Sequence, residues 1–354
     1  MRLRASDVYS YYRPSACELR VYLRARGEPE GRPSPYHEVL RRLGARHEAQ
    51  HLSTFTTVTD LRGGADDERI RRTTEEIQAG TAVLYHPLFV ATTVLNDEEC
   101  TIVGEPDFLI RSGEEYLIRD SKLARRINER DHPEILRQLE TYGWLFERTV
   151  GTWPKGLQVH SGPGDIVDVD CDDGGQLALD VLGHISLIRR SSVEPYEPVG
   201  WTRCGTCGYQ ERCWTRAEDR RDLALVVGVD KGLALALHEE GVNSYDELVS
   251  EYDESSLSAL RRPWGSKTQR VGKRAASILL MAQAMAFDVE HDVVRDARKV
   301  RRGEDCLLAR DLSGAGRLVS GRRCRWPTLK RTTSRRTGPI REIPDPANSP
   351  GLAQ

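Results

Sequence analysis

The sequence lacks the features that mark membrane and secreted proteins. No run approaches the roughly 20 apolar residues that a membrane-spanning helix needs. The segment Met1-Arg2-Leu3-Arg4 is followed by polar residues and not by the apolar core of a signal peptide. No internal repeat is visible. We therefore expect a cytoplasmic protein without a membrane partner. The 354 residues, 38% of them hydrophobic, are enough for two domains with a buried core.

The chain also lacks a large net charge. Its formal charge is −2, so no overall basic field indicates a nucleic-acid partner. The charge is unevenly spread, however. Residues 291–354 hold 15 Lys and Arg against 7 Asp and Glu, a net charge of +8, which leaves −10 for the remainder. Because this segment is rich in Arg, Gly, Ser and Pro and loses its apolar periodicity after Val294, we predict a disordered basic tail.

Residues 104–123, GEPDFLIRSGEEYLIRDSKL, predict a β-hairpin. Residues 101–110 and 116–123 are rich in Ile, Val, Leu, Phe and Tyr, which is typical of strands. The polar segment 112–115 between them is typical of a hairpin loop. Each strand nevertheless carries an Asp where a buried apolar residue would be expected.

The expected pairing of this hairpin brings its charged residues together. If Arg111 pairs with Tyr116, Asp107 lies opposite Asp120. Side chains alternate along a strand, so Asp120 and Lys122 share one face. Two carboxylates at this distance are unfavourable without a positive partner. The pattern therefore predicts a hard divalent cation such as Mg²⁺, which takes oxygen ligands.

Two predicted helices carry further polar residues. Apolar residues at helical spacing predict a helix over residues 34–52, with His47 at the end of the apolar stripe. Taken alone, such a histidine is more often part of a core. A second helix is predicted to begin at Pro133, which suits a first helical turn. Gln138 and Tyr142 lie four residues apart on it and are neighbours on its surface.

The cysteines predict a metal site. Cys204-x2-Cys207-x5-Cys213 places three thiols within ten residues, a spacing typical of zinc or iron–sulfur ligands in a cytosolic protein. Three thiols leave one of the usual four positions open, and Cys17, 187 residues upstream of Cys204, is the candidate for it. The remaining four cysteines stand alone and are interpreted as incidental thiols: Cys100, Cys171, Cys306 and Cys324.

Together these motifs resemble the RecB-like PD-(D/E)xK nucleases that carry an iron–sulfur cluster. That group includes the AddB nuclease domain, the CRISPR adaptation nucleases and stand-alone RecB-like nucleases. The resemblance covers roughly residues 7–214, and the motifs occur in the family's order. The matching residues are His47 in GARHEAQHL, Asp107 in GEPD, Asp120 and Lys122 in DSK, Gln138 and Tyr142 in Q-x-x-x-Y, and Cys17 with Cys204, Cys207 and Cys213.

The resemblance implies a fold and a cofactor. Residues 1–216 would form an α/β restriction-endonuclease-like core with a mixed central sheet and flanking helices. The four cysteines would hold a [4Fe–4S] cluster, although their spacing alone leaves zinc open. Residues 217–290 look like a small helical, helix-hairpin-helix-like region with turn glycines at Gly228 and Gly241, with a plain helical bundle as the alternative. Such modules bind phosphates through backbone N–H groups.

The resemblance also implies catalytic roles. Asp107, Asp120 and His47 would hold Mg²⁺ or Mn²⁺, or His47 would orient the attacking water. Lys122 would orient and deprotonate that water or stabilise the transition state. Asp120 stands where many relatives have Glu. These residues predict a metal-dependent deoxyribonuclease, with exonuclease action as the first hypothesis, in DNA repair, recombination or foreign-DNA processing.

Substrate and partner predictions follow from the same resemblance. Gln138 and Tyr142 would contact DNA, either single-stranded or as a duplex with an end. No Walker A loop is present, since WGSKT lacks the leading glycines, so helicase action would come from another chain. An alternative is a DNA-binding or scaffold subunit of a recombination or CRISPR-adaptation complex, with the iron–sulfur cluster as a structural element.

Overall fold

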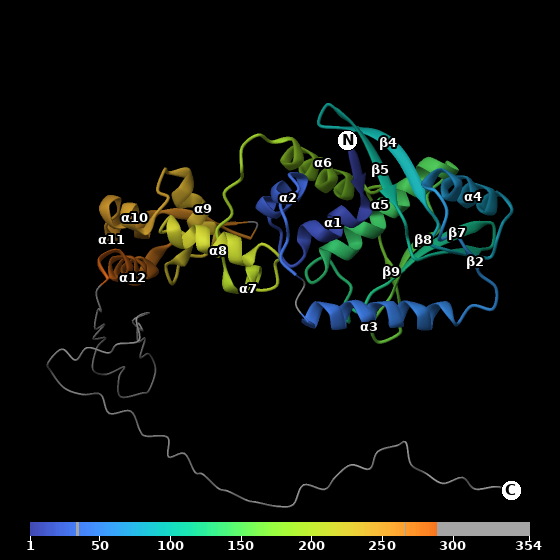
Figure 1. The fold of residues 1–354 in the computed structure, drawn as a ribbon, viewed down its shortest axis with the longest axis horizontal. Coiled ribbons are helices and arrows are strands. Elements are labelled where there is room, and N and C mark those ends of the chain that lie inside the picture. The colour runs from blue at the N-terminus through green and yellow to red at the C-terminus, as the bar shows by residue number, and fades with distance from the viewer. Residues whose placement is uncertain (33–34, 266, 289–354) are drawn as a thin grey trace, which may run out of the picture. The chain divides into compact units, whose positions relative to one another are not determined.

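The computed structural model describes residues 1–32, 35–265 and 267–288. In this part of the chain the fold is mixed α/β, with two mixed sheets and flanking helices (Figure 1). None of the described helices has the length and apolar character needed to cross a membrane. The predicted tail, residues 291–354, and the cysteines at 306 and 324 lie outside the described residues.

The larger sheet contains the predicted hairpin. Its order is β2-β3-β6-β7-β8-β9, in which β2 pairs with β3 and β7 with β8 in parallel, and the other neighbours are antiparallel. The predicted pairing of Arg111 with Tyr116 is confirmed. The strands are β2 (Thr59–Asp60), β3 (Val83–Tyr85), β6 (Phe108–Ser112), β7 (Glu115–Ser121), β8 (Gly156–His160) and β9 (Ile166–Val169).

The predicted strand over residues 101–110 is two strands. One, β5 (Glu98–Gly104), ends before Pro106, and β6 begins after it in the other sheet. Proline has no N–H to donate to a ladder, so it favours a break here. Gly104 lies tight against helix α5 (Pro133–Val150), because a Cβ there would stand 2.5 Å from Leu145 Cδ1. The break places Asp107 between the end of β5 in one sheet and the beginning of β6 in the other.

The smaller sheet joins the beginning of the chain to β5. Its order is β1-β5-β4, with β1 (Arg2–Arg4) parallel to β5 and β4 (Phe89–Leu95) antiparallel to it. Helix α1 (Ala5–Tyr12) follows β1 directly, and the Asp7 carboxylate accepts a hydrogen bond of 2.8 Å from the Arg4 N–H at the start of this helix. The first helix therefore begins beside the end of β5.

Helix α5 passes through the centre of the main core. It begins at Pro133, as predicted, and ends at Gly151, whose φ of 91° suits a left-handed cap. Twelve of its residues are buried, among them Ile135, Leu139 and Phe146. Helices α1 and α6 (Gln176–Arg190) pack against it, and the cluster they share includes residues from both sheets. Burial of this apolar face is the main stabilising term.

Helix α3 (Pro35–Leu52) matches the predicted span, but its apolar stripe is turned outward. Tyr36 is 64% exposed and Leu43 is 46% exposed, whereas His47 and His51 are buried. The periodicity identified the helix correctly but not the side that packs. The remaining helices before the cysteine segment are α2 (Glu18–Ala25) and α4 (Asp66–Gln78).

Residues 223–282 contain a second hydrophobic cluster, which includes Leu233, Leu237 and Ile278. Gly228 and Gly241 both have positive φ, 99° and 89°, as turn glycines do. The helix-hairpin-helix assignment and the boundary at residue 216 stay predictions. The helices and strands from residue 201 to residue 287, which begin with the cysteine segment, are α7 (Trp201–Cys204), α8 (Gln210–Asp219), α9 (Lys231–Glu239), α10 (Tyr245–Glu251), α11 (Glu254–Ala259), β10 (Arg261–Trp264), β11 (Lys267–Arg270) and α12 (Ala275–Phe287).

Candidate active site and thiol cavity

A cavity of about 300 Å³ opens where β5 ends and β6 begins. We call it the carboxylate cavity. Five of the six residues predicted for catalysis and substrate binding line it, and His47 is not among its lining residues. The lining also includes groups from the start of the chain and from the loop before β4. Its polar members are Arg4, Ser6, His86, Glu105, Asp107, Asp120, Lys122, Gln138 and Tyr142.

The two aspartates hold each other in place. The Asp107 N–H donates to Asp120 Oδ1 at 2.9 Å, and the Ser121 N–H donates to Asp107 Oδ2 at 2.6 Å. The carboxylates therefore lie side by side at the open end of the hairpin. Burial, followed by the charge of Asp120, raises the pKa of Asp107 well above its usual range. Asp107 therefore holds its proton more strongly than an ordinary aspartic acid does.

Lys122 lies against the same pair. Its Nζ is 3.0 Å from Asp120 Oδ2, and its backbone N–H donates to the His160 carbonyl at 2.9 Å. Burial opposes the charged form, but Asp120 and then Asp107 outweigh it and raise the pKa of Lys122 above its usual value. Lys122 is thus a fixed positive charge at the cavity wall.

His86 brings a second set of carboxylates to the cavity. Its Nε2 is 2.9 Å from Glu48 Oε1 and its Nδ1 is 2.9 Å from Glu105 Oε1. Burial alone would lower the pKa of His86, but the bonds to Glu105 and Glu48 raise it to about 9. Ligand atoms of Glu48, His86 and Asp107 all lie within 4.8 Å of one another. Oxygen and imidazole donors at this spacing suit a divalent cation.

The backbone of His86 is held in an unusual conformation. Its φ of 53° is left-handed, which a side chain with a Cβ seldom adopts. The His86 N–H donates to the Asp107 carbonyl at 2.9 Å, and Arg69 donates to the His86 carbonyl at 3.1 Å. Arg69 also pairs with Glu105 at 2.9 Å. These contacts direct the imidazole toward Asp107.

His47 lies behind the carboxylate cavity. Its Nε2 is 3.2 Å from the His160 carbonyl oxygen, the same oxygen that accepts the Lys122 N–H. The rings of His47 and His51 each stack on His160, at centroid distances of 4.2 and 4.0 Å. The structure therefore places His47 in a buried histidine stack, while its neighbour Glu48 contacts His86, a residue of the cavity lining.

Gln138 and Tyr142 form one side of the cavity. Gln138 Nε2 donates to the Tyr142 hydroxyl at 2.9 Å, and both side chains are buried. Burial raises the pKa of Tyr142 well above its usual value. The Gln138 Oε1 atom has no hydrogen-bond partner among the described residues. A buried amide oxygen without a partner is unfavourable, so this atom is suited to accept from a bound group.

The beginning of α1 adds positive character to the cavity. Arg4, Ala5 and Ser6, the residues at the start of this helix, belong to the cavity lining. The first N–H groups of a helix have no partner within it and attract anions. Arg4 and Lys122 add two side-chain cations to the lining. One cavity thus combines a carboxylate and imidazole side with a cationic side.

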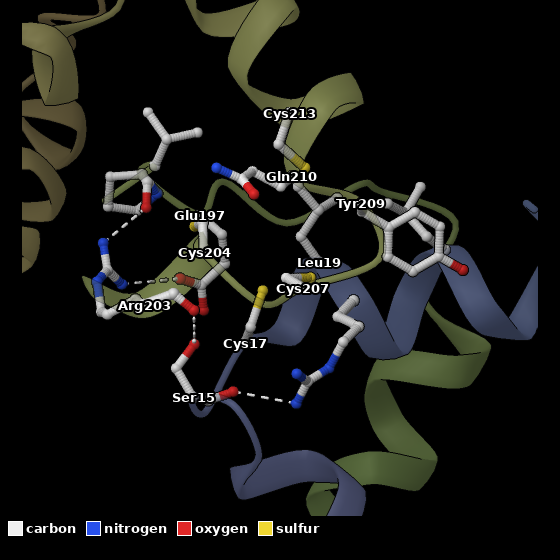
Figure 2. Close-up of a pocket in the computed structure, with 14 residues that line it drawn as sticks. Ser15, Cys17, Leu19, Glu197, Arg203, Cys204, Cys207, Tyr209, Gln210 and Cys213 are labelled. Carbon is white, nitrogen blue, oxygen red and sulfur yellow. Dashed lines mark hydrogen bonds and ion pairs between the residues drawn. The ribbon is translucent and has the colours of Figure 1, made fainter. Parts of the chain in front are cut away.

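The four predicted cysteine ligands line a separate cavity, which we call the thiol cavity (Figure 2). Cys17 precedes α2, Cys204 ends α7, Cys207 follows in the turn and Cys213 lies on α8. Figure 2 shows these side chains around the same space. The chain segments that bear them are separated by most of the main core in sequence and meet only in the fold.

Local contacts fix the walls of the thiol cavity. The Ser15 hydroxyl donates to the Arg203 carbonyl at 3.3 Å, and the Gly31 N–H donates to the Gly208 carbonyl at 2.8 Å. Each bond joins the first segment to the cysteine segment. The Tyr209 hydroxyl adds a third such bond, to the Glu28 carbonyl at 2.8 Å.

Burial favours the protonated form of two of the thiols, those of Cys17 and Cys213. Burial raises the pKa of Cys17 to about 12 and that of Cys213 to about 11. Among the described residues, no three of these thiols have sulfur atoms within 4.8 Å of one another. Zinc or iron is ligated by thiolates, so these thiols would release their protons on binding a metal. The positive charge of the metal would offset the cost of burying the thiolates. Four sulfur donors around one cavity are a chemically suitable set for such a metal.

Several residues in or beside the cavity were missed by sequence reasoning. Glu48 directly follows His47 but gave no motif of its own. His86 and Glu105 flank Pro87 and Pro106, where apolar periodicity is interrupted. Arg4 precedes the span of the family resemblance. A polar residue beside a proline between two strands was the one available signal, and it does not specify a role.

Comparison with known proteins adds little. No family model matches the chain, and the curated proteins give no match. One similar solved structure, titled "Crystal structure of SSO0001", is 14% identical, and the alignment covers 50% of this chain and 96% of that one with a TM-score of 0.27. A likeness of this size carries no inference about the present chain.

Proposed function

We propose that this protein is a metal-dependent deoxyribonuclease with a restriction-endonuclease-like core and a metal-ligating thiol site. The observation that carries the proposal is the composition of the carboxylate cavity. It combines the Asp107 and Asp120 pair, Lys122 and the beginning of α1 in one space. Hydrolysis of a phosphodiester needs a cation, a group that positions water and a site for the phosphate. The cavity offers residues for all three.

The carboxylate side has the donors that a divalent cation needs. Asp107 and Asp120 supply oxygen, and Glu48 and His86 extend the set. Glu105 on His86 Nδ1 resembles the carboxylate–histidine arrangement that orients imidazole ligands. Bound Mg²⁺ or Mn²⁺ would supply Lewis-acid chemistry, polarising a phosphoryl oxygen and acidifying water. The close approach of the Asp107 and Asp120 side chains supports such a cation.

The cationic side is suited to a phosphate. The N–H groups at the start of α1, with the Arg4 side chain, would bind nonbridging phosphate oxygens. Lys122, held on Asp120, would present its ammonium group to the same phosphate and stabilise charge that develops in the transition state. The Gln138 Oε1 atom would accept a hydrogen bond from water or substrate. Each role follows from a group that already faces the cavity.

The thiol cavity supports the second part of the proposal. Four thiols around one space would hold a [4Fe–4S] cluster, the cofactor that the family resemblance implies, with zinc as the alternative. Its distance in sequence from the catalytic motifs favours a structural role. A DNA-binding scaffold protein with an unused catalytic site is the competing function.

The test is cleavage of labelled single-stranded and duplex DNA with Mg²⁺ or Mn²⁺ and with chelator. We expect metal-dependent degradation by the wild type and a loss of about a thousand-fold or more in Asp107→Asn and Asp120→Asn, since each variant loses a charged cation ligand. Asn keeps an oxygen that can accept the backbone hydrogen bonds.

Asp168→Asn is a matched control, because Asp168 lies on β9 outside the cavity lining. Binding of DNA without metal-dependent cleavage, in folded wild-type protein, would contradict the nuclease and favour the scaffold. Activity retained by both Asp variants would contradict the assignment of the site.

A further inference from the structure

A small hairpin in the second hydrophobic region carries a dense positive charge. It consists of β10 and β11, whose register runs from Arg261 opposite Arg270 to Trp264 opposite Lys267. Residues 261–274 contain six Lys and Arg and no Asp or Glu. Without its tail, the rest of the chain is acidic, at −10. The hairpin, with the two cations that follow it at Lys273 and Arg274, is therefore a basic element in a part of the chain that is acidic overall.

Most of the positive charge on this hairpin has no carboxylate partner. Arg262 and Arg274 pair with Asp230, at 3.0 and 3.4 Å. In the part of the chain that is described, no ion pair joins a carboxylate to the other four cations. These are Arg261, Lys267, Arg270 and Lys273. All four side chains belong to exposed residues, and every residue of β11 is exposed.

The base of the hairpin is anchored. Arg262 is 3% exposed, and its guanidinium binds the carboxylate of Asp230, the residue that caps α9. Gly232 permits close contact between α9 and β10, because a Cβ there would stand 2.2 Å from the Pro263 carbonyl oxygen. The Val271 N–H donates to the Leu260 carbonyl at 3.0 Å and closes the hairpin at its base. A two-stranded hairpin seldom persists alone, so these contacts supply its order.

An aromatic side chain stands at the far end of β10. Trp264 is 56% exposed, and the Arg262 guanidinium carbon lies 4.6 Å from the centre of its ring. A cation at this distance stabilises the ring by a cation–π contact. A large exposed aromatic side chain held beside several cations provides both a surface for base stacking and charges for phosphates.

We propose that the β10–β11 hairpin binds single-stranded nucleic acid, with Trp264 stacked on a base and Lys267 and Arg270 on backbone phosphates. Single strands are favoured over duplex because their bases are free to stack. The inference rests on the proposed function for its biological meaning, since the hairpin would hold the strand that the carboxylate cavity acts on. Binding itself is measurable without cleavage.

The first experiment measures binding of a fluorescein-labelled oligo-dT strand by anisotropy, with chelator and without divalent cation, over a range of salt. Compared with wild type, Lys267→Ala/Arg270→Ala should bind roughly ten-fold more weakly at about 0.15 M salt, and the slope of log K against log salt should shrink by about 1.4. The matched control is Arg71→Ala/Arg72→Ala, which removes the same charge from α4.

The second experiment tests stacking. Trp264→Ala should weaken binding roughly 5- to 100-fold with little change in salt slope, whereas Trp264→Phe should recover part of the loss. Trp201→Ala is the control, since Trp201 is also exposed, at 76%, but lies on α7. Thermal unfolding of every variant checks that the fold is kept.

Unchanged affinity and salt slope in the double variant would overturn the proposal. Equal binding of poly-glutamate, with no effect of Trp264→Ala, would identify an acidic protein surface as the partner and also overturn it. The nuclease proposal fails separately: a wild type that binds oligo-dT through the hairpin but never cleaves DNA leaves the present inference intact.

Discussion

The carboxylate cavity and the thiol cavity are built in opposite ways. In the carboxylate cavity the key pair, Asp107 and Asp120, comes from one hairpin, and Asp107 is bonded to Asp120 and to Ser121, which follow it by 13 and 14 residues. In the thiol cavity, Cys17 meets three residues that follow it by about half the chain. One cavity offers hard oxygen donors and the other soft sulfur donors.

This difference separates chemistry from architecture. A hairpin can keep its fold when one carboxylate is replaced, because the strand ladder remains. The thiol cavity is closed by chain segments that lie far apart in sequence, and a metal there would add a link between them across a long loop. The carboxylate cavity should therefore govern activity, and the thiol cavity should govern stability.

The largest effect on stability is expected at Cys17. Cys17→Ser should lose bound metal and lower the free energy of unfolding by about 3–5 kcal/mol, because the cross-link over a long loop is broken. Metal analysis of anaerobically purified protein, with urea denaturation, measures both. Iron with brown colour would support the cluster, and stoichiometric zinc in colourless protein would replace iron by zinc.

The control for this experiment is Cys171→Ser, which changes a partly buried thiol outside the thiol cavity. It should keep the metal content of the wild type. If Cys17→Ser also kept full metal content and stability, the proposed link between the two segments would be wrong, and the contrast between the two cavities would lose its basis.

A smaller effect is expected at two neighbouring residues of α3. Glu48→Gln should weaken Mn²⁺ binding about 10- to 100-fold, because Glu48 faces His86 and Asp107. His47→Gln should change the affinity much less, since His47 contacts the His160 carbonyl. Isothermal titration calorimetry measures both. The opposite order would assign the ligand role to His47, as the family resemblance implies.

The smallest effect is expected from the histidine stack behind the carboxylate cavity. Burial, with His160 and Arg119 nearby, lowers the pKa of His51 to about 4, against about 6.5 in an unfolded chain. Protonation therefore favours the unfolded state, and the stability contributed by neutral His51 is present above pH 6.5 and lost as the pH falls toward 4.

Wild type should accordingly lose about 1 kcal/mol more stability than His51→Gln when the pH is lowered from about 7 to about 5. Urea denaturation at the two pH values gives the difference. Equal losses in the two proteins would show that the fold does not lower the pKa of His51.

The sequence predicted the local part of the site well. Strand pairing follows from alternation and loop length, so the register of Arg111 with Tyr116 was accessible, and with it the Asp107 and Asp120 pair. The split cysteine pattern of the resembled family indicated Cys17 as the fourth ligand, and the fold places it at the same cavity as the other three. A helix start at Pro133 required only the chemistry of proline.

The sequence did not predict how a helix is rotated about its axis relative to the elements that it packs against. Adjacent residues of a helix point about 100° apart, so the rotation of α3 about its axis decides whether His47 or Glu48 faces His86 and Asp107. His86 depends on a left-handed backbone that other contacts hold. The outward apolar stripe of α3, from Tyr36 to Leu43, shows the same limit, since periodicity gives a face but not its partner.

The side chains of Asp107 and Asp120 also join the two strands of the hairpin, through hydrogen bonds from the Ser121 N–H and the Asp107 N–H. Each side chain takes a backbone N–H that the strand ladder does not pair at the open end. Under the proposed function, catalysis and strand alignment thus depend on the same two positions. A replacement that cannot accept a hydrogen bond would remove a cation ligand of the proposed site and one hydrogen bond between the ends of the two strands, while the ladder of β6 and β7 remains. Asparagine at either position would remove the charge and keep the hydrogen bond, whereas alanine would remove both.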